Sequence, residues 1–144
     1  MLENTKPNMV FWIIAIFALL WNLMGVFFWL TEYFLMTEKM KAALSPEQVE
    51  LMQNDPSWGM YIYAIAVFGG VFASILLLMR KKNSVVLFNI SLVCLLILQG
   101  YWIFFIDIEA IAGPQALIMP IIVIAIGIFE SFYSKGAAQN GWLE

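Results

Sequence analysis

The stretch Leu76–Leu87 reads LLLMRKKNSVVL, and its Arg80-Lys81-Lys82 is the only cationic run in the chain. On each side the sequence is apolar over roughly 20 residues, a length that crosses a hydrocarbon core of about 30 Å. Lys and Arg resist translocation, so a short basic turn between two such stretches marks the side on which the chain remains. The three cations therefore predict the cytoplasmic turn of a membrane protein.

The composition supports the same class. Hydrophobic residues make up 63% of the 144 positions and charged residues 12%, whereas a soluble domain carries about 25% charge. We therefore predict an all-α integral membrane protein, a four-transmembrane-helix bundle in which residues 1–144 form one domain. The predicted spans lie near Met9–Leu30, Gly59–Met79, Val85–Ile106 and Gln115–Tyr133.

The remaining lysines predict the orientation. With the basic turn inside, Lys6 and Lys135 also lie inside, against Lys39 and Lys41 outside. Both termini are then cytoplasmic, and the net charge of -3 reflects an acidic outer face. Nucleic acid is not expected as a partner of such a protein, whereas the lipid bilayer is.

The longest predicted loop, residues 31–58, lies outside and contains a helix signal. Ser45 is a good N-cap, Pro46 suits the first helical position, and Gln48 can complete a capping box. We therefore expect a short external helix over about residues 45–53. The loop is either a structural lid or a gate for a substrate.

Small residues indicate where the helices should meet, because lipid gives helices little hydrophobic reason to associate. One such residue is in the first span, four form a surface on the second, and one is in the fourth. These predicted packing residues are Gly25, Ala66, Gly69, Gly70, Ala73 and Gly127.

Two amides inside the apolar spans need hydrogen-bond partners, since an unpaired amide in hydrocarbon is costly. Asn22 lies in the first span and Gln99 in the third. Either the two side chains bond each other across a dry interface, or they line a polar cavity. In the second case the cavity opens to the outer face and is rimmed by Glu32 and Glu109.

Glu130 is the only carboxylate within a predicted span. A proton- or cation-coupled carrier commonly needs such a group. The other interpretation is that Glu130, close to the expected inner end of its span, reaches the interface or pairs with Lys135.

Several kinds of chemistry are not expected. The chain has no histidine, and Cys94 is its single cysteine, so neither an internal disulfide nor a Cys/His metal or haem site can be assembled. No nucleophile-and-base pattern and no phosphate-binding loop is present in the sequence. We expect no cofactor, no metal site and no enzymatic activity.

Four phrases carry a family resemblance: Phe11–Val26 (FWIIAIFALLWNLMGV), Tyr63–Lys82 (YAIAVFGGVFASILLLMRKK), Gly113–Pro120 (GPQALIMP) and the terminal Gly141-Trp142-Leu143. Together they resemble a family of small bacterial four-span membrane proteins that automatic annotation often labels sugar transporters. The resemblance implies the bacterial inner (cytoplasmic) membrane and supports four spans. It transfers no functional residues.

Two functions remain open at this point. The first is a small-solute transporter or channel subunit that acts as a homo-oligomer, since four helices rarely enclose a solute path alone. The second is a structural or accessory subunit of a larger membrane complex. A polar path through Asn22 and Gln99 favours transport, whereas a dry bundle with an exposed small-residue face favours the accessory role.

Overall fold

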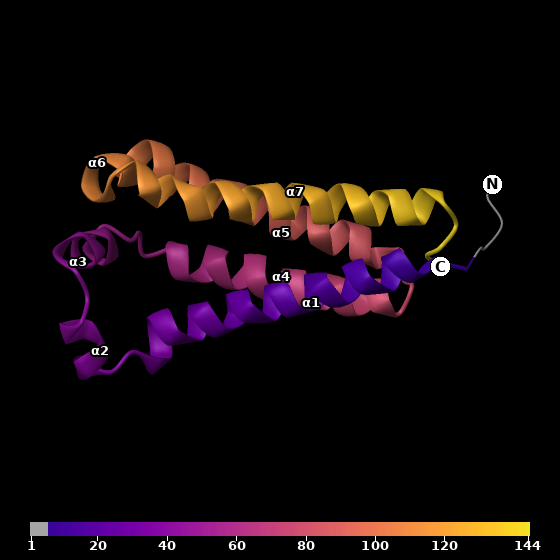
Figure 1. Cartoon of the computed structure of the whole chain (residues 1–144), viewed down its shortest axis with the longest axis horizontal. Coiled ribbons are helices and arrows are strands. Elements are labelled where there is room, and N and C mark those ends of the chain that lie inside the picture. Colours follow the sequence, from indigo (N-terminus) through magenta and orange to yellow (C-terminus); the bar gives the residue numbers. More distant parts are fainter. Residues whose placement is uncertain (1–5) are drawn as a thin grey trace.

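The computed structural model describes residues 6–144, which form helices and connecting loops without a strand. Four long helices run side by side along the molecule (Figure 1): α1 (Met9–Leu30), α4 (Gly59–Leu78), α5 (Asn83–Gly100) and α7 (Ile118–Gln139). With their extensions, four segments are long and apolar enough to cross a membrane: Met9–Leu35, Gly59–Leu78, Asn83–Ile106 and Pro114–Gln139. The predicted all-α, four-span fold is confirmed.

The fourth span ends later than the sequence suggested. The expected end is Tyr133, but α7 continues to Gln139, and its last turns bury Ser134 and Ala137. The helix stops only where Gly141 adopts a left-handed backbone (φ 77°), a conformation that glycine enters without steric cost. The span therefore extends well beyond its expected end.

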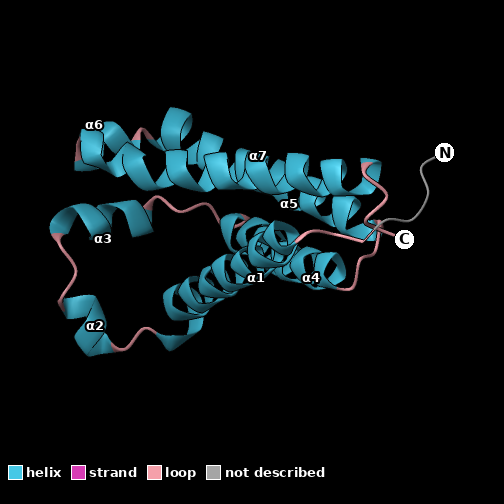
Figure 2. Cartoon of the chain, turned by 45° about the vertical axis from the view of Figure 1, so that its right-hand side comes forward, coloured by secondary structure: helices cyan, strands magenta, loops and turns pink. Residues whose placement is uncertain are grey.

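Short helices occupy the loops at one end of the bundle (Figure 2): α2 (Glu38–Ala42), α3 (Pro46–Gln53) and α6 (Ile108–Ala112). The helix expected over about residues 45–53 is confirmed as α3. Its capping box is complete, since the Ser45 hydroxyl accepts from the Gln48 backbone N–H at 3.2 Å and the Gln48 side chain accepts from the Ser45 N–H at 2.9 Å. We call this end, marked by α2, α3 and α6, the loop end.

The opposite end carries the basic turn and the carboxyl-terminal tail, and we call it the basic end. Arg80 donates from Nε to the Trp142 carbonyl at 2.8 Å. Backbone bonds also join the two segments, from Lys82 N–H to the Glu144 carbonyl and from Glu144 N–H to the Arg80 carbonyl. The carboxyl terminus and the start of α1 thus lie at the same end as Arg80–Lys82 (Figure 1). The predicted location of the amino terminus concerns Met1–Thr5, which lie outside the described residues.

The long helices pack in the order α1, α4, α5, α7. Extensive contacts join α1 to α4, α4 to α5 and α5 to α7, whereas within residues 6–144 no comparable contact joins α1 to α7. These two outer helices lie closest near the basic end and diverge toward the loop end (Figures 1 and 2). The bundle is therefore packed at one end and splayed at the other.

The buried hydrophobic cluster lies toward the basic end. It combines two large aromatic side chains with small residues that let the helices approach, and Leu143 of the tail completes it. Its members are Phe11, Ala15, Ala18, Ala73, Leu77, Phe88, Ala137 and Leu143. The Phe11 ring stacks on Tyr133 of α7 and meets Trp142 edge-on. This end of the bundle is closed by packing.

The small residues selected from the sequence lie at helix contacts. A methyl group added at Gly70 would overlap the Asn22 side chain, and one at Gly25 would come within 2.9 Å of Val67. Of the other four, Ala66 and Ala73 are buried, Gly127 lies tightly against Leu92 and Leu95, and Gly69 is partly buried with Ser91 at an ordinary contact distance. These residues are therefore used for packing within the chain.

Candidate functional site

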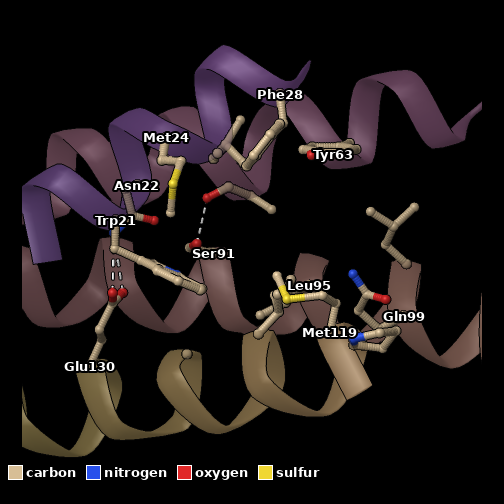
Figure 3. Close-up of a pocket in the computed structure, with 17 residues that line it drawn as sticks. Trp21, Asn22, Met24, Phe28, Tyr63, Ser91, Leu95, Gln99, Met119 and Glu130 are labelled. Carbon is tan, nitrogen blue, oxygen red and sulfur yellow. Dashed lines mark hydrogen bonds between the residues drawn. The ribbon is translucent and has the colours of Figure 1, made fainter. Parts of the chain in front are cut away.

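A cavity of about 330 Å³ lies between the four long helices, in the part of the bundle where α1 and α7 diverge (Figure 3). A second cavity of about 210 Å³ lies toward the loop end, lined by residues that include Glu32 and Asp55. The two cavities share four lining residues: Tyr63, Leu98, Gln99 and Pro120. The shared residues make the two cavities adjacent. We call the first the main cavity and the second the vestibule.

The polar end of the main cavity is a hydrogen-bonded pair between α1 and α7. Asn22 Nδ2 donates to Glu130 Oε1 at 3.2 Å and Oε2 at 3.3 Å. The same nitrogen lies 2.8 Å from the Ala18 carbonyl and 3.4 Å from Ser74 Oγ. Both side chains are buried, with exposed fractions of 8% for Asn22 and 7% for Glu130. Figure 3 shows the two facing each other across the gap between the helices.

Local sequence explains why Asn22 can occupy this place. It is the central residue of the Met9–Leu35 span, and the neighbouring α4 has glycine at position 70, where a side chain would displace it. The Ser74 hydroxyl donates to the Gly70 carbonyl at 2.7 Å, so the small face of α4 carries its own satisfied polar group. The amide is thus held deep in the bundle.

The expected bond between Asn22 and Gln99 is wrong. The Asn22 amide bonds Glu130 of α7 instead, and within residues 6–144 its side-chain partners do not include Gln99. Gln99 nevertheless lines both cavities, and Asn22 lines the main one. The alternative in which both amides line a cavity is the one that the geometry favours.

The interpretation that Glu130 reaches the interface or pairs with Lys135 is also wrong. Its carboxylate faces inward to Asn22. The expectation depended on a helix end at Tyr133. Because α7 continues to Gln139, Glu130 lies about two and a half turns before the end of the helix.

Only half of the expected rim is present. Glu32 lines the vestibule, whereas Glu109 lies exposed on α6 and lines neither cavity. Asp55 lines the vestibule with Glu32, a role that the sequence did not indicate. The Tyr33 hydroxyl donates to Asp55 Oδ2 at 2.7 Å. Burial raises the pKa of Asp55, while the Tyr33 hydrogen bond lowers it.

The walls of the main cavity are mostly apolar and aromatic. Trp21 and Phe28 come from α1, Tyr63 from α4 and Met119 from α7. Ser91, the remaining hydroxyl of the lining, donates to the Ala66 carbonyl at 2.5 Å and so is already satisfied. The polar groups available to a bound molecule are therefore those of Asn22, Glu130, Gln99 and Tyr63.

The polar groups of the main cavity are suited to binding a ligand. In the described part of the chain, no group of three or more Cys, Asp or Glu side chains is placed to hold a metal ion. A carboxylate and an amide at the end of an apolar cavity can orient a ligand through charge and hydrogen bonds. Comparison with protein-family models, with curated proteins and with solved structures finds no match to this chain.

Proposed function

We propose that the protein is a small-solute carrier of the bacterial inner (cytoplasmic) membrane. In this proposal the solute enters from the loop end, passes the vestibule and binds in the main cavity against Asn22 and Glu130. The observation that carries the proposal is the adjacency of the two cavities from Glu32 to Glu130. A substrate site near the bilayer midplane is typical of carriers.

The closed basic end favours a carrier over a channel. Beyond Glu130 the bundle is filled by the cluster around Phe11, Leu77 and Leu143. A channel needs a path through both ends at once, whereas a carrier opens each end in turn. A second conformation that separates α1 from α7 near Phe11 would complete the cycle.

The orientation belongs to the same proposal and follows the distribution of lysine and arginine. Arg80–Lys82 faces the cytoplasm, and α2, α3 and α6 face outward. Cysteines introduced at Asn54 and at Asn83, in a Cys94→Ser background, test this with an impermeant thiol reagent on intact cells. Labelling at position 54 alone is expected, and labelling at position 83 would reverse the orientation.

The test of transport is uptake into proteoliposomes of a panel of radiolabelled solutes, one cationic, one neutral and one anionic. A carrier gives saturable uptake of at least one class, stimulated by the same solute on the opposite side. Glu130→Gln should reduce this uptake, and Glu109→Gln, at an exposed site outside both cavities, should not. Uptake that equals that of protein-free vesicles for every class would reject the carrier.

The accessory role has less support than it had from the sequence. It required an exposed face of small residues, but the predicted ones are occupied inside the chain. The homo-oligomer expected of a transporter needs a test of its own. Purification in mild detergent tests both, because a stoichiometric membrane partner would favour the accessory role and a multiple of the chain mass would favour the oligomer.

A further inference from the structure

The charges around the two cavities all have the same sign. Glu130 lines the main cavity, and Glu32 and Asp55 line the vestibule. Among residues 6–144, neither cavity is lined by a lysine or an arginine. A route bordered by carboxylates alone attracts cations and repels anions.

The Glu130 carboxylate is only partly satisfied. A carboxylate can accept about four hydrogen bonds, yet within the described residues its one recorded donor is Asn22 Nδ2, which also contacts the Ala18 carbonyl. In the same part of the chain, no lysine or arginine forms an ion pair with Glu130. A charge within the membrane is costly unless it is paired, so a positively charged ligand would stabilise the ionised form of Glu130.

The other walls of the main cavity suit the rest of such a ligand. Trp21, Phe28 and Tyr63 offer aromatic faces, and a cation over such a face is stabilised by the ring quadrupole. Met24 and Met119 add flexible apolar surface. A volume of about 330 Å³ admits a small aromatic or branched alkyl body.

Three residues that line the main cavity are also exposed on the outside of the bundle. Met24, Phe28 and Met119 line it and are 43%, 51% and 53% exposed. These residues come from α1 and α7, the two helices that diverge (Figure 1). A ligand with an apolar body can therefore approach from the membrane as well as from the vestibule.

We propose that the main cavity binds lipophilic organic cations, with the positive charge against Glu130 and the apolar body between the walls of α1 and α7. This inference rests on the proposed function in one respect, that the substrate site of the carrier is the same cavity. The inference adds that the substrates of this carrier are lipophilic organic cations.

Calorimetric titration of the purified chain in detergent tests the inference with two soluble aromatic ions of similar size, phenyltrimethylammonium and benzenesulfonate. The cation should bind about tenfold or more tightly than the anion, as expected for a desolvated cation held by a carboxylate and aromatic faces. Glu130→Gln should weaken binding of the cation by about tenfold. Glu130→Asp, which keeps the charge, should retain the preference, and Glu109→Gln should match the wild type.

Equal binding of the two ions, or unchanged cation binding in a folded Glu130→Gln protein, would overturn the inference. The second result would point to a lipid chain or a neutral solute as the occupant. Melting temperatures of all variants confirm that they are folded. Because this experiment measures binding without transport, loss of the inference leaves the carrier open, and cation binding without uptake rejects the carrier alone.

Discussion

The basic end and the loop end are built from the same four helices but differ in how they are filled. At the basic end, Ala15, Ala18 and Ala73 are buried between helices, and Phe11 fills the space beside α7. Toward the loop end, bulky rings stand between the helices, among them Trp29, which meets Phe68 edge-on at 5.4 Å. One end is therefore packed, and the other keeps two cavities.

The difference follows the courses of α1 and α7, which lie close near the basic end and diverge toward the loop end (Figures 1 and 2). Small residues let α1 and α4 approach in both halves, with Ala15 and Ala73 toward the basic end and Gly25 toward the loop end. Toward the loop end, α1 continues as the π-helical turns Thr31–Leu35 and α5 as Tyr101–Ile106, both rich in aromatic and aliphatic side chains. Asn22 and Glu130 lie between the packed part of the bundle and the part that contains the cavities.

The largest expected effect is at the packed end. Phe11→Ala should lower the free energy of unfolding by about 3–5 kcal/mol, because the ring is fully buried and its removal leaves a cavity. Phe72→Ala on α4, where the ring is 57% exposed, is the matched control. Unfolding in mixed detergent micelles measures both, and similar losses for the two variants would mean that the basic end is not a packed core.

The next effect concerns the approach of α1 to α4. Gly70→Leu should cost about 1–3 kcal/mol, since the new side chain would displace Asn22 from Glu130. Gly136→Leu is the control, because an added Cβ there has no neighbour within 4 Å in residues 6–144. If both substitutions lower the melting temperature equally, the glycine face of α4 is not a helix contact.

Much of the fold could be predicted because span length and capping are local properties. Apolar runs defined the four spans, and Ser45 with Gln48 defined α3. The site could not be predicted in the same way, since pairing depends on helix order and on depth in the bundle. Because α7 continues past Tyr133, Glu130 lies farther from the helix end than expected. There its carboxylate accepts a hydrogen bond from Asn22, whose expected partner was Gln99.

The Asn22–Glu130 pair should have a smaller effect than either packing change. A double-mutant cycle with Asn22→Leu and Glu130→Leu should give a coupling energy of about 0.6–1.7 kcal/mol, the range for polar bonds between membrane helices. The corresponding cycle of Asn22→Leu with Gln99→Leu should be additive within about 0.5 kcal/mol. Coupling in the second cycle but not in the first would mean that Asn22 bonds Gln99 and not Glu130.

The smallest effect is expected in the vestibule. Tyr33→Phe removes the hydrogen bond to Asp55 and should cost about 0.5–1 kcal/mol, near the lower part of the usual range for such bonds. The hydroxyl stabilises the charged carboxylate, so its loss should raise the pKa of Asp55 further above the usual value. A carboxyl-carbon NMR titration measures the shift, and an unchanged or lower pKa would mean that the two side chains do not meet.

The central claim, a bundle hollow toward the loop end and closed at the basic end, is tested most directly by thiol accessibility. Gln99→Cys lies on the lining shared by both cavities, and Ser134→Cys replaces a fully buried residue of the basic half. Each is made in a Cys94→Ser background, placed in lipid nanodiscs and treated with a charged methanethiosulfonate reagent. The account predicts rapid modification at position 99 and protection at position 134 until the protein unfolds. Equal rates at the two positions, or faster modification at position 134, would contradict it.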